Sequence, residues 1–215
     1  PMNAIVTRVA SFMYFRRMVS MTFAMIKPEA VAFPHVAMSP ISNATPPSAS
    51  RRRQLPPFMT ASPVNSLSSS LSELIRRLIN KAIFRRISSG GLEVVGAKRI
   101  QLSANDAKEL YGIHRDKFFY ERLIRHVTSG PVIVMQLRSK NDDAIECWRR
   151  LMGPSKLLKS LKESERTSLR AQFAISDTRN LVHGADSTQR AVVEMRLFAP
   201  YPPLHLNNIL AHSVQ

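Results

Sequence analysis

The stretch that does most to decide how this chain folds is Asn180-Leu181-Val182-His183-Gly184-Ala185-Asp186-Ser187. It places a histidine in a short loop directly before a predicted helix over 187–198, with Asp186 or Ser187 as the N-cap and Pro200 as the stop. A neutral imidazole is a good nucleophile near pH 7, because its unperturbed pKa is about 6.5. An acceptor must orient its other ring nitrogen, and Glu194 in the following helix is the candidate.

Outward from this stretch, the sequence predicts short strands alternating with helices. Buried or edge strands are expected over 22–26, 93–102, 132–137 and 172–176. A helix is expected to begin at Ser70, with Glu73 completing a capping box, and to end at 88–91. Further helices are expected over 103–111, 119–128 and 142–152. This order is typical of a ferredoxin-like α/β (α+β) sandwich, whose antiparallel four-stranded sheet we expect to carry helices on one face.

Composition divides the chain into three regions. Residues 1–20 bear arginines but no acidic residue, which predicts either a mitochondrial leader or an unstructured one. The domain is expected over 21–200, interrupted at 32–70 by a Ser-, Pro- and Ala-rich insertion that predicts disorder. The arginine run 51–53 within the insertion is either a solvated loop or a patch for nucleic acid or sorting. The tail, 201–215, carries little signal.

The chain has 215 residues, 44% of them apolar, and a net charge of +16. Such a balance favours anionic partners: nucleotides, nucleic acid or anionic lipid. The single cysteine, Cys147, excludes an intrachain disulfide, and no apolar run is long enough to cross a bilayer. The sequence holds no GxxxxGK[ST] loop and no Gly-rich dinucleotide turn, and its histidines lack the spacing of metal ligands.

Four motifs in order carry a resemblance to a known family: Met25-Ile26-Lys27-Pro28-Glu29, Phe118-Phe119, Ser129-Gly130-Pro131 and the stretch 180–187. Together they resemble the nucleoside diphosphate kinases over about 22–31 and 91–200. The segments 119–123, 148–154 and 177–180 are similar to the divergent type 6 branch. That branch is associated with mitochondria, in agreement with the leader; the alternative is a cytoplasmic protein.

The resemblance implies a role for each matching residue. His183 would be the nucleophile that accepts the phosphoryl group, and Glu194 the acceptor that orients it. Phe118 would stack on the nucleobase without distinguishing one base from another. The other residues implied to bind the nucleotide are Lys27, Arg149, Ser155 and Arg170 at the phosphates, Asn180 at the ribose, and Tyr111 near the phosphohistidine. Mg²⁺ would arrive on the nucleotide, bridged by phosphate oxygens, without metal ligands from the protein.

Some residues depart from the family pattern. Ala185 stands where a serine is usual, which removes a hydroxyl near Glu194, and Ser155 replaces a threonine. The segment 153–170 is longer than in the hexameric enzymes, and 166–171 replaces a Pro- and Gly-bearing turn, so oligomeric state and turnover stay open.

Three functions therefore follow from the sequence. The first is a nucleoside diphosphate kinase that transfers the γ-phosphoryl group of ATP to nucleoside diphosphates by a ping-pong mechanism, as a homo-oligomer or with a protein partner. The second is a catalytically weak binding or regulatory module that acts with a protein partner. The third, a basic nucleic-acid binder, has only the net charge in its favour.

Overall fold

The computed structural model describes residues 21–31, 64–140, 142–156, 159, 162 and 165–203, and for 64–73 the backbone alone. The expected leader, most of the expected insertion and nearly all of the expected tail lie outside these residues. None of the helices in the part of the chain described combines the length and apolarity that a bilayer span would need.

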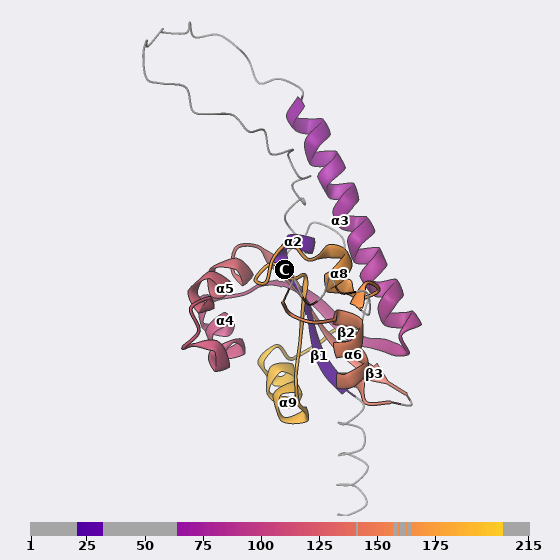
Figure 1. Ribbon diagram of the computed structural model, residues 1–215, viewed down its shortest axis with the longest axis vertical. Helices are drawn as coiled ribbons and strands as arrows, with labels where there is room; N and C mark the ends of the chain where they lie inside the picture. The colour runs from indigo at the N-terminus through magenta and orange to yellow at the C-terminus, as the bar shows by residue number, and fades with distance from the viewer. Residues whose placement is uncertain are drawn as a thin grey trace, which may run out of the picture.

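A four-stranded sheet forms the centre of the molecule (Figure 1). Its strands are β1 (Met21–Ile26), β2 (Leu92–Gln101), β3 (Pro131–Ser139) and β4 (Val182–Gly184). Their order is β2-β3-β1-β4, and all three neighbouring pairs are antiparallel. The predicted ferredoxin-like α+β class is therefore confirmed, and β1 lies inside the sheet between β3 and β4.

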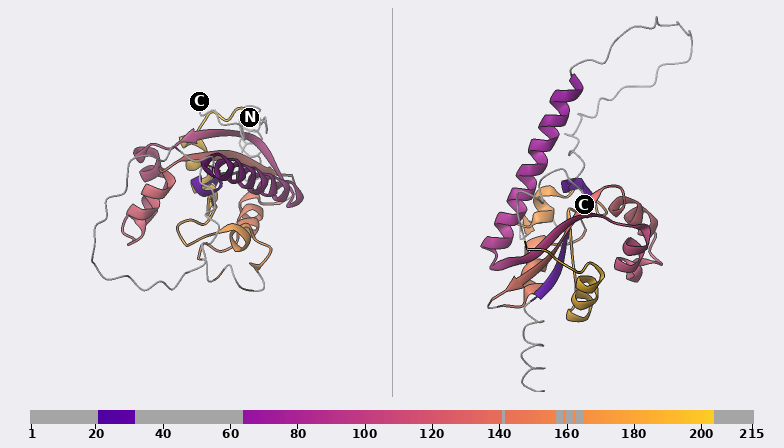
Figure 2. Two further views of the ribbon diagram at one scale, coloured as in Figure 1. Left: turned by 90° about the horizontal axis from the view of Figure 1, so that it is seen from above. Right: turned by 180° about the vertical axis from the view of Figure 1, so that it is seen from behind.

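Helices cover both faces of the sheet, not one face as the sequence predicted (Figure 2). One core joins Ala24 and Ile26 of β1 to α3 (Val64–Ser89) and α6 (Ala144–Met152). The other joins Phe23 and Met25 to α4 (Ala104–Leu110), α5 (Tyr120–Val127) and α9 (Thr188–Leu197). Successive side chains of a strand point to opposite faces, so the four consecutive apolar residues 23–26 are buried on both faces of the sheet.

The last strand lies later in the chain than predicted. Residues 172–176 do not form a strand: α8 (Leu169–Phe173) covers their first half, and Ser168 caps it by accepting from Ala171 N. The strand is instead β4, and it contains His183 itself, which the sequence had placed in a loop. A three-residue strand is too short to show a period-2 pattern in the sequence. The pattern at 172–176 is typical of a strand, although these residues do not form one.

The structure confirms two of the predicted helix starts and contradicts a third. Ser103 and Ser187 cap α4 and α9 as expected, and Asp106 completes a capping box at the former. Ser70 does not begin α3, which starts at Val64 within the expected insertion. Serine is only mildly unfavourable inside a helix, so the Ser-rich stretch 64–70 does not prevent helix formation.

Candidate active site

Pairing between β1 and β4 brings the two most distant motifs together. The register sets Met25 opposite His183 and Ile26 opposite Val182. Immediately beyond the strand, Lys27 N donates to Leu181 O at 2.8 Å. The end of β1, which continues into α2 (Pro28–Val31), therefore lies beside the residues that precede His183.

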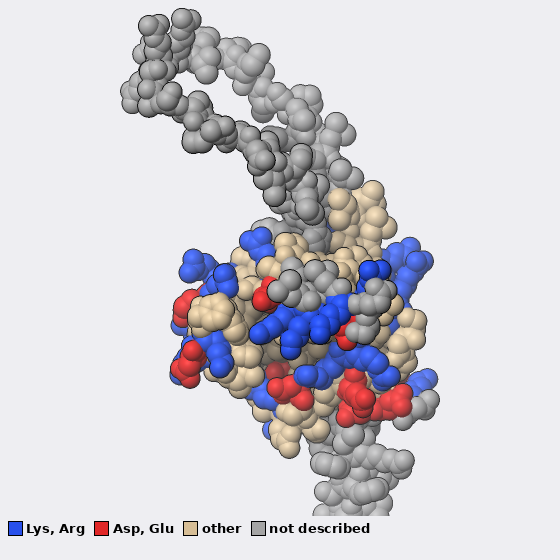
Figure 3. All heavy atoms as spheres, in the orientation of Figure 1, with Lys and Arg blue, Asp and Glu red and all other residues tan. Residues whose placement is uncertain are grey.

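These elements border a cleft of about 510 Å³. Figure 3 shows Lys and Arg side chains around a hollow on this face. All nine residues selected from the sequence line the cleft: Lys27, Tyr111, Phe118, Arg149, Ser155, Arg170, Asn180, His183 and Glu194. The structure thus gathers the predicted set at one place, while the role of each member stays a prediction.

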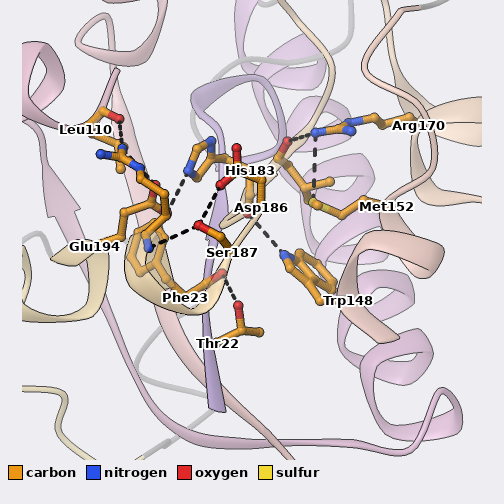
Figure 4. Close-up of polar contacts among 12 residues, drawn as sticks. Thr22, Phe23, Leu110, Trp148, Met152, Arg170, His183, Asp186, Ser187 and Glu194 are labelled. Carbon is orange, nitrogen blue, oxygen red and sulfur yellow. Dashed lines mark hydrogen bonds and ion pairs between the residues drawn. The ribbon is translucent and has the colours of Figure 1, made fainter. Parts of the chain in front are cut away.

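His183 is held on several sides (Figure 4). Its Nε2 lies 3.1 Å from Glu194 Oε2, and its backbone carbonyl accepts from Trp148 Nε1 at 3.2 Å. The ring of Tyr111 meets the imidazole edge-on, 5.1 Å away between centroids. Gly184 is needed here, because a Cβ on it would lie 2.3 Å from the fully buried ring of Trp148. Close packing of Trp148 against β4 therefore fixes the backbone that carries the histidine.

The contact with Glu194 decides which ring nitrogen is available. An ionised carboxylate only accepts hydrogen bonds, so Nε2 must carry the proton of the neutral ring. The lone pair then lies on Nδ1. The Glu194 carboxylate is almost completely buried, and its second oxygen, Oε1, accepts from Arg190 Nη2 at 3.0 Å. Ala185 is buried and has no hydroxyl to offer.

Lys27 is a buried cation at one side of the cleft. Its ammonium donates to Asn180 Oδ1 at 2.6 Å and to Thr178 O at 3.1 Å, which leaves one of its three protons. Burial lowers the pKa of Lys27 to about 8; the charge of Glu29 acts against this shift and that of Arg170 adds to it. Asn180, expected at a ribose, also donates its amide to Ser155 O and Asp177 O.

Arg170, which the resemblance placed at the phosphates, hydrogen-bonds to three backbone carbonyls. Its Nη1 donates to Gly153 O at 2.6 Å, its Nη2 to Val182 O at 2.9 Å and its Nε to Asn180 O at 3.3 Å. Burial, with the nearby charge of Arg149 adding to it, lowers the pKa of Arg170 to about 10. In this structure the guanidinium binds the backbone beside His183 and still contributes its charge to the cleft.

Exposed groups form the outer rim of the cleft. Phe118 has 92% of its surface exposed, and both faces of its ring are therefore largely open to solvent. Arg149 and Ser155 are also exposed on the cleft wall. The rim thus offers an apolar ring for stacking and cationic and hydroxyl groups for an anion.

Sequence reasoning missed two parts of this arrangement. One is Arg190, which looks like an ordinary helix-surface residue. The other is the buried pair Glu29 and His126, in which Glu29 Oε2 lies 2.6 Å from His126 Nε2. Glu29 Oε1 also accepts from Leu181 N at 2.7 Å. Arg190 lies four residues before Glu194, so the only sequence signal for it is the i,i+4 spacing of an oppositely charged pair. The pair of Glu29 with His126 has no local sequence signal.

Known proteins resemble this chain in sequence. The family model described as nucleoside diphosphate kinase matches residues 72–201. The chain is 42% identical over 125 residues to a nucleoside diphosphate kinase of Helicobacter pylori, a match spanning 58% of this chain and 86% of the relative. It is 38% identical over 126 residues to one of Campylobacter fetus, spanning 59% and 88%.

Solved structures show the same fold. The Aquifex aeolicus nucleoside diphosphate kinase superposes with a TM-score of 0.56 at 23% identity, over 84% of this chain and 95% of that one. The Encephalitozoon cuniculi enzyme gives 0.58 at 19% identity, over 86% and 94%. The family model and the curated relatives thus place the chain in a class of phosphotransferases. The chain belongs to the nucleoside diphosphate kinase family.

Proposed function

We propose that this protein transfers the γ-phosphoryl group of ATP to nucleoside diphosphates through a phosphohistidine at His183. The observation that carries the proposal is the pairing of His183 Nε2 with the buried carboxylate of Glu194, 3.1 Å away, in a cleft lined by cations. This pairing leaves the lone pair of Nδ1 for attack on phosphorus.

Two half-reactions follow. In the first, the Nδ1 lone pair forms a bond to the γ-phosphorus while the bond from that phosphorus to the ADP oxygen breaks, and ADP leaves. The ring then carries positive charge, which the Glu194 carboxylate stabilises. In the second, an oxygen of the acceptor's terminal phosphate attacks the same phosphorus, the N–P bond breaks, and Nδ1 regains its lone pair. Splitting the transfer keeps two anionic nucleotides from meeting in one cleft.

The cleft's charges suit a polyphosphate. Its lining includes six cationic side chains: Lys27, Arg122, Arg149, Lys156, Arg170 and Arg190. Phosphoryl transfer depends mainly on positioning and on positive charge around the phosphates. Phe118 on the rim is proposed to stack on the base, and Asn180 to contact the ribose.

Mg²⁺ is proposed to enter with the nucleotide. In the described residues, no group of three or more His, Cys, Asp or Glu side chains is arranged to hold a metal. Asp177 and Asp186 line the cleft, and their carboxylates would contact an ion that enters with the nucleotide. When bound, the ion would neutralise charge on the phosphates, and the side chains named above would orient them.

Exchange of label tests the function. The full chain incubated with γ-labelled ATP and Mg²⁺ is expected to retain label that is stable to base and labile to acid. After removal of nucleotide, added GDP should take the label as GTP, with ping-pong kinetics. A chain that binds ATP in a thermal-shift assay but takes no label and exchanges none would instead be the catalytically weak binding module.

Lys27 makes the reaction sensitive to alkaline pH. Because its folded pKa is about 8, the ammonium loses its charge as the pH rises through 8, and kcat/KM is expected to fall there. Stability should change the other way: between about pH 8 and 10.5 the unfolded chain binds more protons, so the free energy of unfolding rises with pH. Lys27→Arg keeps its charge and should move the fall in kcat/KM to higher pH. An unchanged fall in that variant would assign it to another group.

Location and assembly remain proposals from the sequence. Residues 1–20 favour mitochondria over the cytoplasm, and the type 6 resemblance favours the same compartment. A homo-oligomer or a complex with a protein partner is proposed from the family resemblance alone.

A further inference from the structure

We propose that Arg190 is a positioning residue for phosphoryl transfer, which keeps the Glu194 carboxylate ionised and facing His183. This inference rests on the proposed function and assigns part of its machinery to a residue that the family motifs do not contain.

The geometry divides the Glu194 carboxylate between two partners. Its Oε2 faces His183 Nε2 at 3.1 Å, and its Oε1 accepts from Arg190 Nη2 at 3.0 Å. The carboxylate side chain is 3% exposed, whereas Arg190 is 24% exposed at the cleft wall. Within the described part of the chain, Arg190 is the only cation in hydrogen-bonding contact with this buried anion.

A buried carboxylate without a cation tends to take up a proton, because the neutral form costs far less to bury. A protonated Glu194 could donate to Nε2, and the proton of the imidazole would then lie on Nδ1. That tautomer has no lone pair directed at the phosphorus. Keeping Glu194 charged is therefore equivalent to keeping the nucleophile in its active form.

The other charged or titratable groups near Glu194 do not replace the guanidinium. Tyr111, at the end of α4, and Tyr201, after α9, both have a pKa raised by burial and by the Glu194 charge, so both are neutral phenols. His183 is the group being oriented. The positive charge beside the carboxylate thus comes from Arg190.

Arg190 also ties two elements of the site together. The same Nη2 donates to Leu110 O at 2.8 Å, at the last residue of α4. The next residue, Tyr111, sets its ring edge-on to His183. Arg190 thereby holds α9, which carries Glu194, against the segment that packs on the imidazole.

Three variants of the full chain test the inference. Arg190→Met removes the charge and the donors, Arg190→Lys keeps the charge, and Arg196→Met is a matched control on the exposed side of the same helix. For each variant we would measure the single-turnover rate of labelling by ATP and the affinity for ADP by calorimetry. The tautomer of His183 would be read from its ¹⁵N chemical shifts, and the His183→Gln variant would assign that signal.

Arg190→Met is expected to slow labelling by about 10- to 100-fold, the size of effect that removing an outer partner has at metal-bound histidines. The ¹⁵N spectrum should show His183 shifted toward the Nδ1–H form, with a smaller change in ADP affinity. Arg190→Lys should recover part of both, and Arg196→Met should match the parent chain. An unchanged tautomer with a large loss of ADP affinity would make Arg190 a nucleotide-binding group and overturn the inference. Absence of label on the parent chain would refute the proposed function, while the tautomer comparison would still test Arg190.

Discussion

Replacing His183 by alanine is expected to lower nucleotide-dependent phosphoryl transfer by at least about 10⁴-fold, because it removes the atom that forms the covalent intermediate. The fold should persist, since the side chain lies at the cleft wall and is 16% exposed. The measurement is steady-state transfer from ATP to GDP, together with acid-labile label on the protein. ADP binding should survive, which would separate loss of the nucleophile from loss of the cleft.

A second histidine in the same cleft provides the discriminating control. His114 lies in the short 3₁₀ helix η1 (Gly112–His114), and its ring is 6.3 Å from that of Tyr111. Burial and the nearby His183 lower the pKa of His114, which favours its neutral form near pH 7. In the described residues no carboxylate hydrogen-bonds to it, as Glu194 does to His183. His114→Gln should therefore keep the label, and label lost only in that variant would transfer the nucleophile's role to His114.

The sequence was most informative where a motif and a burial pattern coincided. The largely apolar runs at 22–26 and 132–137 form the two inner strands, and each is buried on both faces. The same runs should have predicted helices on both sides of the sheet. The strand that holds His183 could not be predicted, because it is three residues long and is defined by its pairing with β1.

The candidate site likewise has residues that the sequence predicted and residues that only the tertiary structure reveals. The nine residues to which the resemblance assigned a role all line one cleft, and the resemblance could select them because the motifs along the chain align it with the family. The residues that hold them are less visible. In the sequence, Arg190 resembles a solvent-facing helix residue. Its contact with Leu110 O depends on the packing of α9 beside α4, which the sequence does not reveal. His126 belongs to a different element from Glu29 and is 97 residues away, so only tertiary structure pairs them.

That pair leads to the largest expected effect on stability. Glu29 is 2% exposed and contacts His126, while its other oxygen accepts from the backbone N–H of Leu181. Burial acts to raise the pKa of Glu29, but the hydrogen bond from His126 and the charge of Lys27 hold it below its usual value. Leu181 has a φ of 73°, a left-handed conformation that a leucine avoids unless its surroundings impose it. Glu29 thus fixes the backbone between Asn180 and His183.

Glu29→Ala should therefore lower the free energy of unfolding by about 2–6 kcal/mol, because two buried hydrogen bonds each lose one partner at a cost of about 1–3 kcal/mol. Three groups lose their support at once: His126, the Leu181 N–H and the strained turn. Urea unfolding followed by the fluorescence of the single tryptophan, Trp148, would measure the change. Glu93→Ala is the matched control, because the pair of Glu93 with Arg138 lies at the surface, and its change should fall within experimental error.

The free energy of unfolding should depend on acidic pH differently in the parent chain and in the Glu29→Gln variant. Because the folded pKa of Glu29 is below its unfolded value, its contribution to stability is present above the unfolded pKa and is lost as the pH falls through the folded one. Glu29→Gln cannot titrate, so its stability should change less over this acidic range than that of the parent chain. If Glu29→Ala were no more harmful than Glu93→Ala, or if Glu29→Gln kept the parent's acid dependence, the carboxylate would not be what holds Leu181 in place. The alignment of His183 with Glu194 would then depend on Trp148 and Arg170, which bind the backbone of the same strand.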